Sequence, residues 1–146
     1  MDRNQPSLEK SLLTHLQTNG VGYDVLRYIC LPDLLGKDSS SLLYIMGKNL
    51  ARKLQPDSIT EIVDYFSLFG WGQLTLVKEK RRELVLELTS EVIAQRQKVN
   101  IAEIDYRLES GFLAESMEQI KNIACECTEE IKAKNTTVQF NVIYTK

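Results

Sequence analysis

The chain has 146 residues, of which 43% are hydrophobic and 26% are charged, and its formal net charge at pH 7 is −2. This composition is typical of a folded globular protein and excludes disordered and collagen-like classes. The nearly balanced charge provides no global positive field, so we expect no nucleic-acid partner.

The N-terminus and the cysteines indicate the compartment. The first ten residues, MDRNQPSLEK, lack the apolar region of a signal peptide, and no apolar run approaches the roughly 18 residues of a membrane span. An odd number of cysteines, three, fits a reducing environment. We therefore expect a cytoplasmic protein with no membrane span, composed of a short tail (residues 1–7) and a single domain (residues 8–146).

Three helices are predicted in the first third of the chain. The first carries leucines at helical spacing: Leu8, Leu12, Leu13 and Leu16. The second covers residues 23–30, and Pro32 is expected to break or kink it because proline lacks a backbone N–H. The third follows cap candidates at residues 38–41 and carries the apolar stripe Leu43, Met46, Gly47, Leu50 and Leu54.

Gly47 lies inside that third stripe. A glycine in a helix interior costs about 1 kcal/mol relative to alanine, so we expect another backbone to pack closely against Gly47. A fourth helix is predicted from the capping box Ser58-Ile59-Thr60-Glu61 to Phe69-Gly70.

After Gly70 the apolar period changes from 3.6 to 2, which predicts strands. Leucines alternate with other residues at positions 74–77 and 84–88. Other apolar residues, among them cysteine, valine and phenylalanine, alternate with their neighbours in the same way at positions 123–128 and 138–144. Two more helices, at residues 90–98 and 108–120, lie between these hairpins. The order predicts an α/β (α+β) fold in which a four-stranded antiparallel sheet packs against about six helices.

The connection of the first hairpin is basic, with Lys78, Lys80, Arg81 and Arg82 interrupted by Glu79. Two interpretations remain open: a solvated hairpin tip, or a contact with phosphate or an acidic partner.

The residues that carry most enzyme chemistry are sparse. The single histidine, His15, lies in a polar setting, and no phosphate loop, zinc-protease or nucleophile-elbow motif occurs. Cys125 and Cys127 could be small core residues of a strand or a redox pair, but two of the four ligands of a zinc site would be missing. We expect no cofactor, no metal and no catalytic site.

An aromatic and glycine-rich cluster stands at the junction between the fourth helix and the first strand. It contains Phe69, Gly70, Trp71 and Gly72, and the two glycines flank the only tryptophan. Such glycines indicate backbone dihedrals that side chains forbid. Trp71 is either a core anchor or part of a pocket or subunit interface.

At these residues the chain resembles the YslB-like family of small bacterial proteins. The resemblance rests on four segments in register: residues 31–36, residues 47–53, Gly70-Trp71-Gly72, and residues 108–115 with the sequence LESGFLAE. It covers residues 22–142. That family is in turn similar to the vinyl-four-reductase domain and to small subunits of the TRAPP vesicle-tethering complex.

The resemblance implies an antiparallel sheet packed against helices, dimerisation through helices, and an apolar cavity for a small molecule or acyl chain. The vinyl-four-reductase pattern ends with two cysteines around a glycine turn. Cys127 or its neighbour matches the first, but Val138 stands at the second and residues 132–135 contain no glycine. Some TRAPP subunits carry an acyl chain on a cysteine, for which Cys30 is the candidate here.

Together these observations predict a non-catalytic homodimer that binds an apolar small molecule, an acyl chain or a protein partner. A redox sensor or small enzyme that uses Cys125 and Cys127 is the alternative. The candidate ligand-binding or interface residues are Cys30, Gly47, Phe69, Gly70, Trp71, Gly72, Gly111 and Phe112.

Overall fold

The computed structural model describes residues 20–99, 104–132, 134 and 136–145. The described elements follow in this order: α2 (Gly20–Val25), the π-helical turn η1 (Leu26–Cys30), α3 (Leu31–Leu35), the 3-10 turn η2 (Gly36–Asp38), α4 (Ser39–Leu54), α5 (Ile59–Leu68), β1 (Gln73–Glu79), β2 (Glu83–Thr89), α6 (Glu91–Val99), α7 (Arg107–Lys121), β3 (Cys125–Lys132) and β4 (Thr137–Tyr144).

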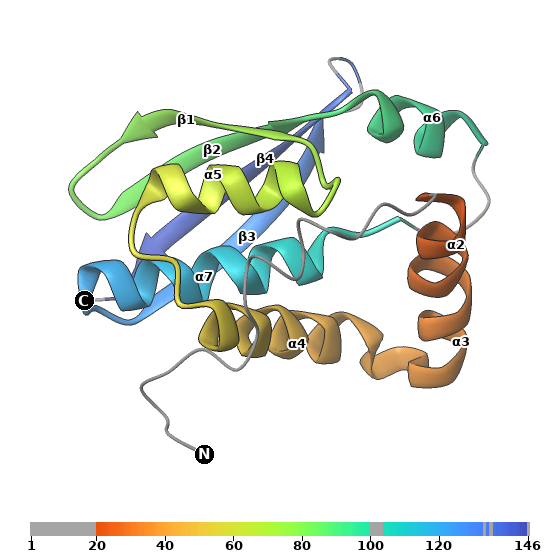
Figure 1. Cartoon of the computed structure of the whole chain (residues 1–146), viewed down its shortest axis with the longest axis horizontal. Helices are drawn as coiled ribbons and strands as arrows, with labels where there is room; N and C mark the ends of the chain where they lie inside the picture. The colour runs from red at the N-terminus through yellow and green to blue at the C-terminus, as the bar shows by residue number, and fades with distance from the viewer. Residues whose placement is uncertain (1–19, 100–103, 133, 135, 146) are drawn as a thin grey trace.

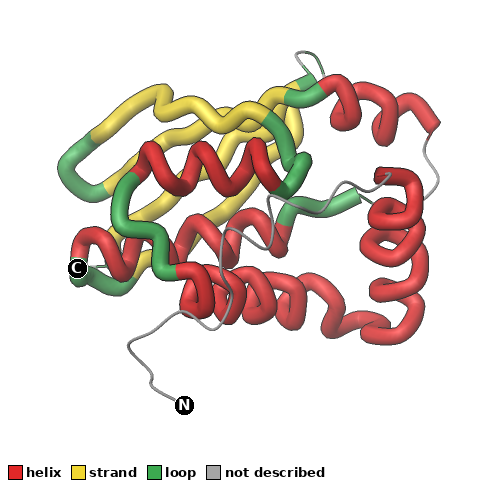
Figure 2. The backbone as a smooth tube through the Cα atoms, viewed as in Figure 1, coloured by secondary structure: helices red, strands yellow, loops and turns green. Residues whose placement is uncertain are grey.

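The two hairpins join into one four-stranded antiparallel sheet of order β1-β2-β4-β3, as predicted. Figure 1 shows α5 and α7 across one face of this sheet, α4 beyond α7, and α2 and α3 at one end. Figure 2 separates the helical and strand layers by colour. The alternating residues Val138, Phe140 and Val142 are fully buried, so β4 faces the core on the side where the helices lie.

The prediction of about six helices was too high for the described part of the chain. The first predicted helix, with Leu8 to Leu16, lies outside the described residues, and α2, η1 and α3 follow one another without a break. Pro32 does not break this helical run. It is near the start of α3, directly after the π-helical turn η1, and the run ends at Gly36 with a φ of 63°.

The fourth predicted helix begins and ends where its caps indicate. The Ser58 hydroxyl accepts a hydrogen bond from the Glu61 N–H at 3.1 Å, which satisfies one of the free donors of the α5 N-terminus. The chain then turns through Gly70 and Gly72, whose φ values of 75° and 138° confirm that this junction requires glycine.

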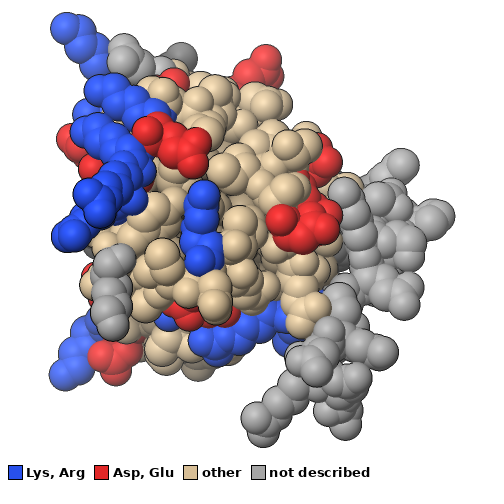
Figure 3. All heavy atoms as spheres, turned by 90° about the vertical axis from the view of Figure 1, so that its left-hand side faces the viewer, with Lys and Arg blue, Asp and Glu red and all other residues tan. Residues whose placement is uncertain are grey.

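The basic connection forms the tip of the β1–β2 hairpin, and Lys78, Lys80, Arg81 and Arg82 are all exposed. Figure 3 views the end of the molecule that carries this hairpin, and Lys and Arg side chains gather there with acidic side chains among them. This arrangement agrees with the solvated-tip interpretation.

The helices α4 and α7 cross in close contact at two glycines. A Cβ atom added to Gly47 would fall on the carbonyl oxygen of Leu108, and one added to Gly111 would fall on the carbonyl oxygen of Tyr44. Backbone therefore meets backbone at this crossing, which confirms the close approach predicted at Gly47. The contact leaves no room for any side chain at either position.

Replacing Gly47 or Gly111 with alanine is expected to lower the free energy of unfolding by about 1–3 kcal/mol, because the helices must separate to admit the methyl group. Gly22→Ala is the matched control. Nothing lies within 4 Å of a Cβ built on Gly22, so this change should be neutral or stabilising. Urea unfolding of the three variants tests the difference. Equal stability of Gly47→Ala and Gly22→Ala would contradict the close packing.

Candidate functional site

A cavity of about 440 Å³ lies between α2, the C-terminal end of α5 and α6. Three segments far apart in the sequence supply its walls, and both aromatic and polar side chains are among them. The lining residues are Gly20, Val21, Tyr23, Asp24, Phe69, Gly70, Val92, Gln95 and Arg96. The volume falls within the range of small-molecule sites in proteins.

Tyr23 connects the cavity wall to the interior. Its hydroxyl oxygen accepts one hydrogen bond from Arg27 Nη1 at 2.7 Å and another from the indole Nε1 of Trp71 at 3.2 Å. Burial, followed by the Glu109 carboxylate, raises the pKa of Tyr23 above its ordinary value. The phenol is therefore neutral at physiological pH.

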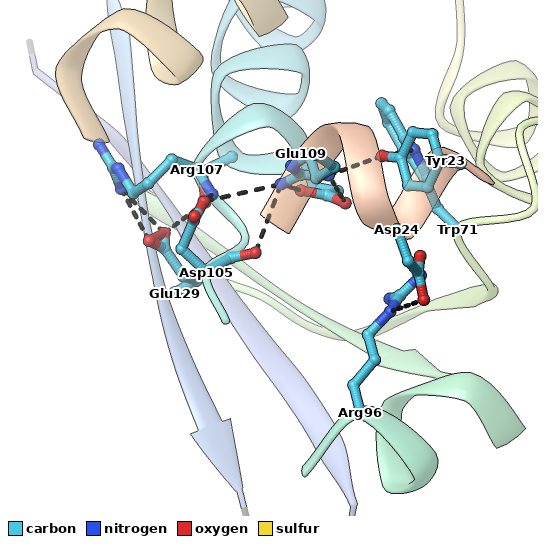
Figure 4. Close-up of polar contacts among 10 residues, drawn as sticks. Tyr23, Asp24, Trp71, Arg96, Asp105, Arg107, Glu109 and Glu129 are labelled. Atoms are coloured by element: carbon cyan, nitrogen blue, oxygen red, sulfur yellow. Dashed lines mark hydrogen bonds and ion pairs between the residues drawn. The ribbon is translucent and has the colours of Figure 1, made fainter. Parts of the chain in front are cut away.

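Below Tyr23 lies a buried ion pair between Arg27 of η1 and Glu109 of α7. The two side chains are each 2% exposed, and they meet at 2.7 Å (Nη2 to Oε1) and 3.0 Å (Nη1 to Oε2). Burial alone would lower the pKa of Arg27, but the Glu109 carboxylate reverses this effect and raises it, so the guanidinium stays charged. Figure 4 shows Glu109 between Asp105 and Tyr23.

A second ion pair closes one side of the cavity. Arg96 of α6 donates to Asp24 of α2 through Nε at 3.2 Å and Nη2 at 2.8 Å, and the two side chains are 9% and 20% exposed. Arg96 and Arg27 both lie over the Tyr28 ring, with each guanidinium carbon 5.0 Å from the ring centroid. The pair holds α2 against α6 (Figure 4).

The aromatic cluster predicted at the helix–strand junction packs beside this network. Trp71 is 6% exposed, and its ring meets those of Phe66, Phe69 and Phe112 edge to face, with centroids 4.9, 4.8 and 5.7 Å away. Trp71 is thus a core residue whose N–H reaches Tyr23. Phe69 and Gly70 also line the cavity.

The other candidate residues lie apart from the cavity walls. Gly47 and Gly111 form the helix crossing, Gly72 begins the approach to β1, and Phe112 belongs to the aromatic cluster. Cys30 is exposed at the end of η1. Their assignment to a ligand site or a subunit interface stays a prediction.

Cys125 and Cys127 point into the core from β3 and are both buried. Burial, with the carboxylates of Glu118 and Glu115, raises the pKa of Cys125 to about 11, and burial also raises the pKa of Cys127. The thiolate is the reactive form of cysteine, so this environment suits packing better than redox chemistry. In the described part of the chain, no three His, Cys, Asp or Glu side chains are grouped to hold a metal ion.

Sequence reasoning missed the polar residues of the site: Tyr23, Asp24, Arg27, Arg96 and Glu109. A signal was present for Glu109, which precedes Phe112 by three positions and so shares its helix face, where a charge requires a buried partner. Nothing in the sequence identified that partner. Arg27 lies 82 positions away.

Removing one member of the buried pair should be costly. Glu109→Gln leaves the buried Arg27 charge with only the more distant and partly exposed Asp105 carboxylate, at 3.6 Å, so we expect a loss of about 3 kcal/mol in the free energy of unfolding. The double change of Arg27→Met with Glu109→Leu should recover much of that loss. The control is Glu130→Gln, which removes an exposed ion pair to Lys132 and should cost no more than about 1 kcal/mol. Urea unfolding measures all three, and equal losses for the two single variants would contradict the role of the pair.

The fold is found in solved structures of other proteins, two of which are compared with it below. A vinyl-4-reductase family protein from Methanocaldococcus jannaschii has a TM-score of 0.65 at 18% identity, with 93% of this chain and 88% of that chain covered. The phenol-responsive sensory domain of the transcription activator PoxR, solved with phenol, has a TM-score of 0.63 at 12% identity, with 88% and 76% covered. The first likeness confirms the vinyl-four-reductase fold expected from the sequence. The relation to TRAPP subunits stays a prediction.

Within the described residues, no helix has both the length and the apolar character needed to cross a bilayer.

The uncharacterized protein YslB of Bacillus subtilis (strain 168) is 38% identical over 130 residues, which are 89% of this chain and 87% of YslB. A family model described as "Protein of unknown function (DUF2507)" matches residues 20–143. This match spans most of the chain and agrees with the likeness to YslB, so the chain belongs to the DUF2507 family.

Proposed function

We propose that this protein is a non-catalytic domain that binds a small, mostly apolar molecule in the cavity between α2, α5 and α6. The observation that carries the proposal is the cavity itself, which combines aromatic and aliphatic walls with a few fixed polar groups. Its size and its mixed lining suit a molecule with one ring or a short chain. The fold adds support, because one neighbour of the same fold is a sensory domain solved with phenol.

The polar groups at the cavity favour binding over catalysis. Asp24 and Arg96 neutralise each other, and the Tyr23 hydroxyl accepts one hydrogen bond from Arg27 and one from Trp71. A general base or nucleophile needs a free approach to substrate, and these hydrogen bonds already occupy the Asp24 carboxylate and the Tyr23 hydroxyl oxygen. An acyl chain attached to Cys30 receives less support, since Cys30 is absent from the cavity walls.

Phenol is a suitable first probe of the cavity. We expect phenol to change the fluorescence of Trp71, the only tryptophan, because its ring centroid lies 4.8 Å from that of the lining residue Phe69. Val92→Phe should fill the cavity and abolish the response. Val77→Phe, at an exposed position on β1, should leave it intact.

Native mass spectrometry of protein purified from its own host provides a complementary measurement, since it detects a retained small molecule directly. The proposal fails if neither measurement finds a ligand, or if Val92→Phe binds phenol as well as the unmodified protein does.

The second part of the proposal is that the domain forms a homodimer through apolar helix surfaces. Large apolar side chains are exposed on two helical segments: Val25, Leu26 and Ile29 on α2 and η1, and Leu42, Ile45 and Met46 on α4. Leu43, which belongs to the apolar stripe predicted for the same helix as Met46, is fully buried instead. A two-fold contact would cover such side chains on both subunits at once.

Sedimentation equilibrium at low micromolar concentration tests the dimer. We expect a dimer mass in dilute buffer and also in molar salt, because apolar contacts are not screened by ions. Ile29→Lys and Met46→Lys should each weaken the dimer, whereas Val77→Lys should not, since Val77 is equally exposed but lies on β1. A monomer mass under both salt conditions would refute this part, and a dimer lost only in high salt would refute its apolar basis.

A further inference from the structure

We infer that the cavity selects uncharged ligands, and that Asp24 sets this preference by occupying Arg96. The inference rests on the proposed function and adds to it the charge class of the ligand and the residue that determines it.

Asp24 and Arg96 are the two charged side chains among the described residues that line the cavity. They form two hydrogen bonds to each other, from Arg96 Nη2 at 2.8 Å and Nε at 3.2 Å, in the two-point side-on geometry that matches a guanidinium to a carboxylate. Each charge is therefore already balanced by the other. The walls present a net charge of zero to a ligand.

The nearest buried charges outside the cavity lining, those of Arg27 and Glu109, are also paired with each other. Arg27 is paired with Glu109 on both of its terminal nitrogens, and Tyr23 stands between this pair and the cavity. An ionised ligand would leave water and find no free counter-charge among the described residues that line the cavity. Removal of a charge from water without such a partner is strongly unfavourable.

A carboxylate ligand could reach Arg96 only by displacing Asp24. That exchange would gain no ion pair, because Asp24 would lose the contact that the ligand gains. An uncharged ring, in contrast, can pack against Tyr23 and Phe69 without disturbing the Asp24–Arg96 pair, and the exposed Gln95 amide remains available for one hydrogen bond.

Three probes of nearly equal size test the charge class in the unmodified protein: benzyl alcohol, benzoate and benzylammonium at pH 7. Trp71 fluorescence and calorimetry report their binding. We expect benzyl alcohol to bind, and each ion to bind at least about tenfold more weakly. An ion that binds as tightly as benzyl alcohol would overturn the inference and leave the proposed function standing. Failure of all three to bind would overturn the proposed function itself.

Asp24→Asn tests the residue assigned to this preference. The change frees Arg96 while it keeps the shape of the side chain, so benzoate should gain at least about tenfold in affinity, and benzylammonium should not. Asp33→Asn is the matched control, since it removes the same charge from an exposed position on α3. Thermal unfolding verifies that both variants fold, and the comparison of the three probes in the unmodified protein does not depend on either. No gain of benzoate binding in folded Asp24→Asn would refute the role of Asp24.

Discussion

The buried ion pair between Arg27 and Glu109 determines how the first helical run is placed on the rest of the protein. The two charges stand almost wholly out of water and satisfy each other through two hydrogen bonds. A shift of η1 along α7 would separate these buried charges, which is far more costly than the loss of an apolar contact. Since Tyr23 and Asp24 lie within one helical turn of Arg27, the same pair fixes their positions at the cavity.

The helix α7 receives a different kind of contact on each of its sides. Glu109 binds η1, Gly111 meets the backbone of α4, and Phe112 enters the aromatic cluster around Trp71. The other side of α7 packs on β3 and β4. Every residue from Glu109 to Met117 is buried, so the helix has no solvent face in this stretch. Its position is therefore overdetermined, and it provides a rigid base on which the more exposed cavity is built.

Local features of the fold could be predicted from the sequence, but contacts between residues far apart in the chain could not. The Ser58 cap, the period-two strands and the close approach at Gly47 each follow from the chemistry of a few neighbouring residues. Pro32 was expected to break or kink the helix, but the helical run continues through it, with a π-helical turn directly before it. The Arg27–Glu109 pair joins residues 82 positions apart, and a charge pattern alone does not select one partner among many. Phe69 and Gly70 were among the candidate ligand-binding residues, but the other lining residues were not identified, since the walls of the cavity come from three separate segments.

The position of α2 depends mainly on polar contacts. No residue of α2 is buried, and the contacts that hold it include those made by Tyr23 and Asp24 at the cavity itself. Because α2 continues directly into η1, the buried Arg27–Glu109 pair limits how far α2 can shift. Under the proposed function, a ligand in the cavity would meet the same two side chains and would act on the polar contacts that hold α2.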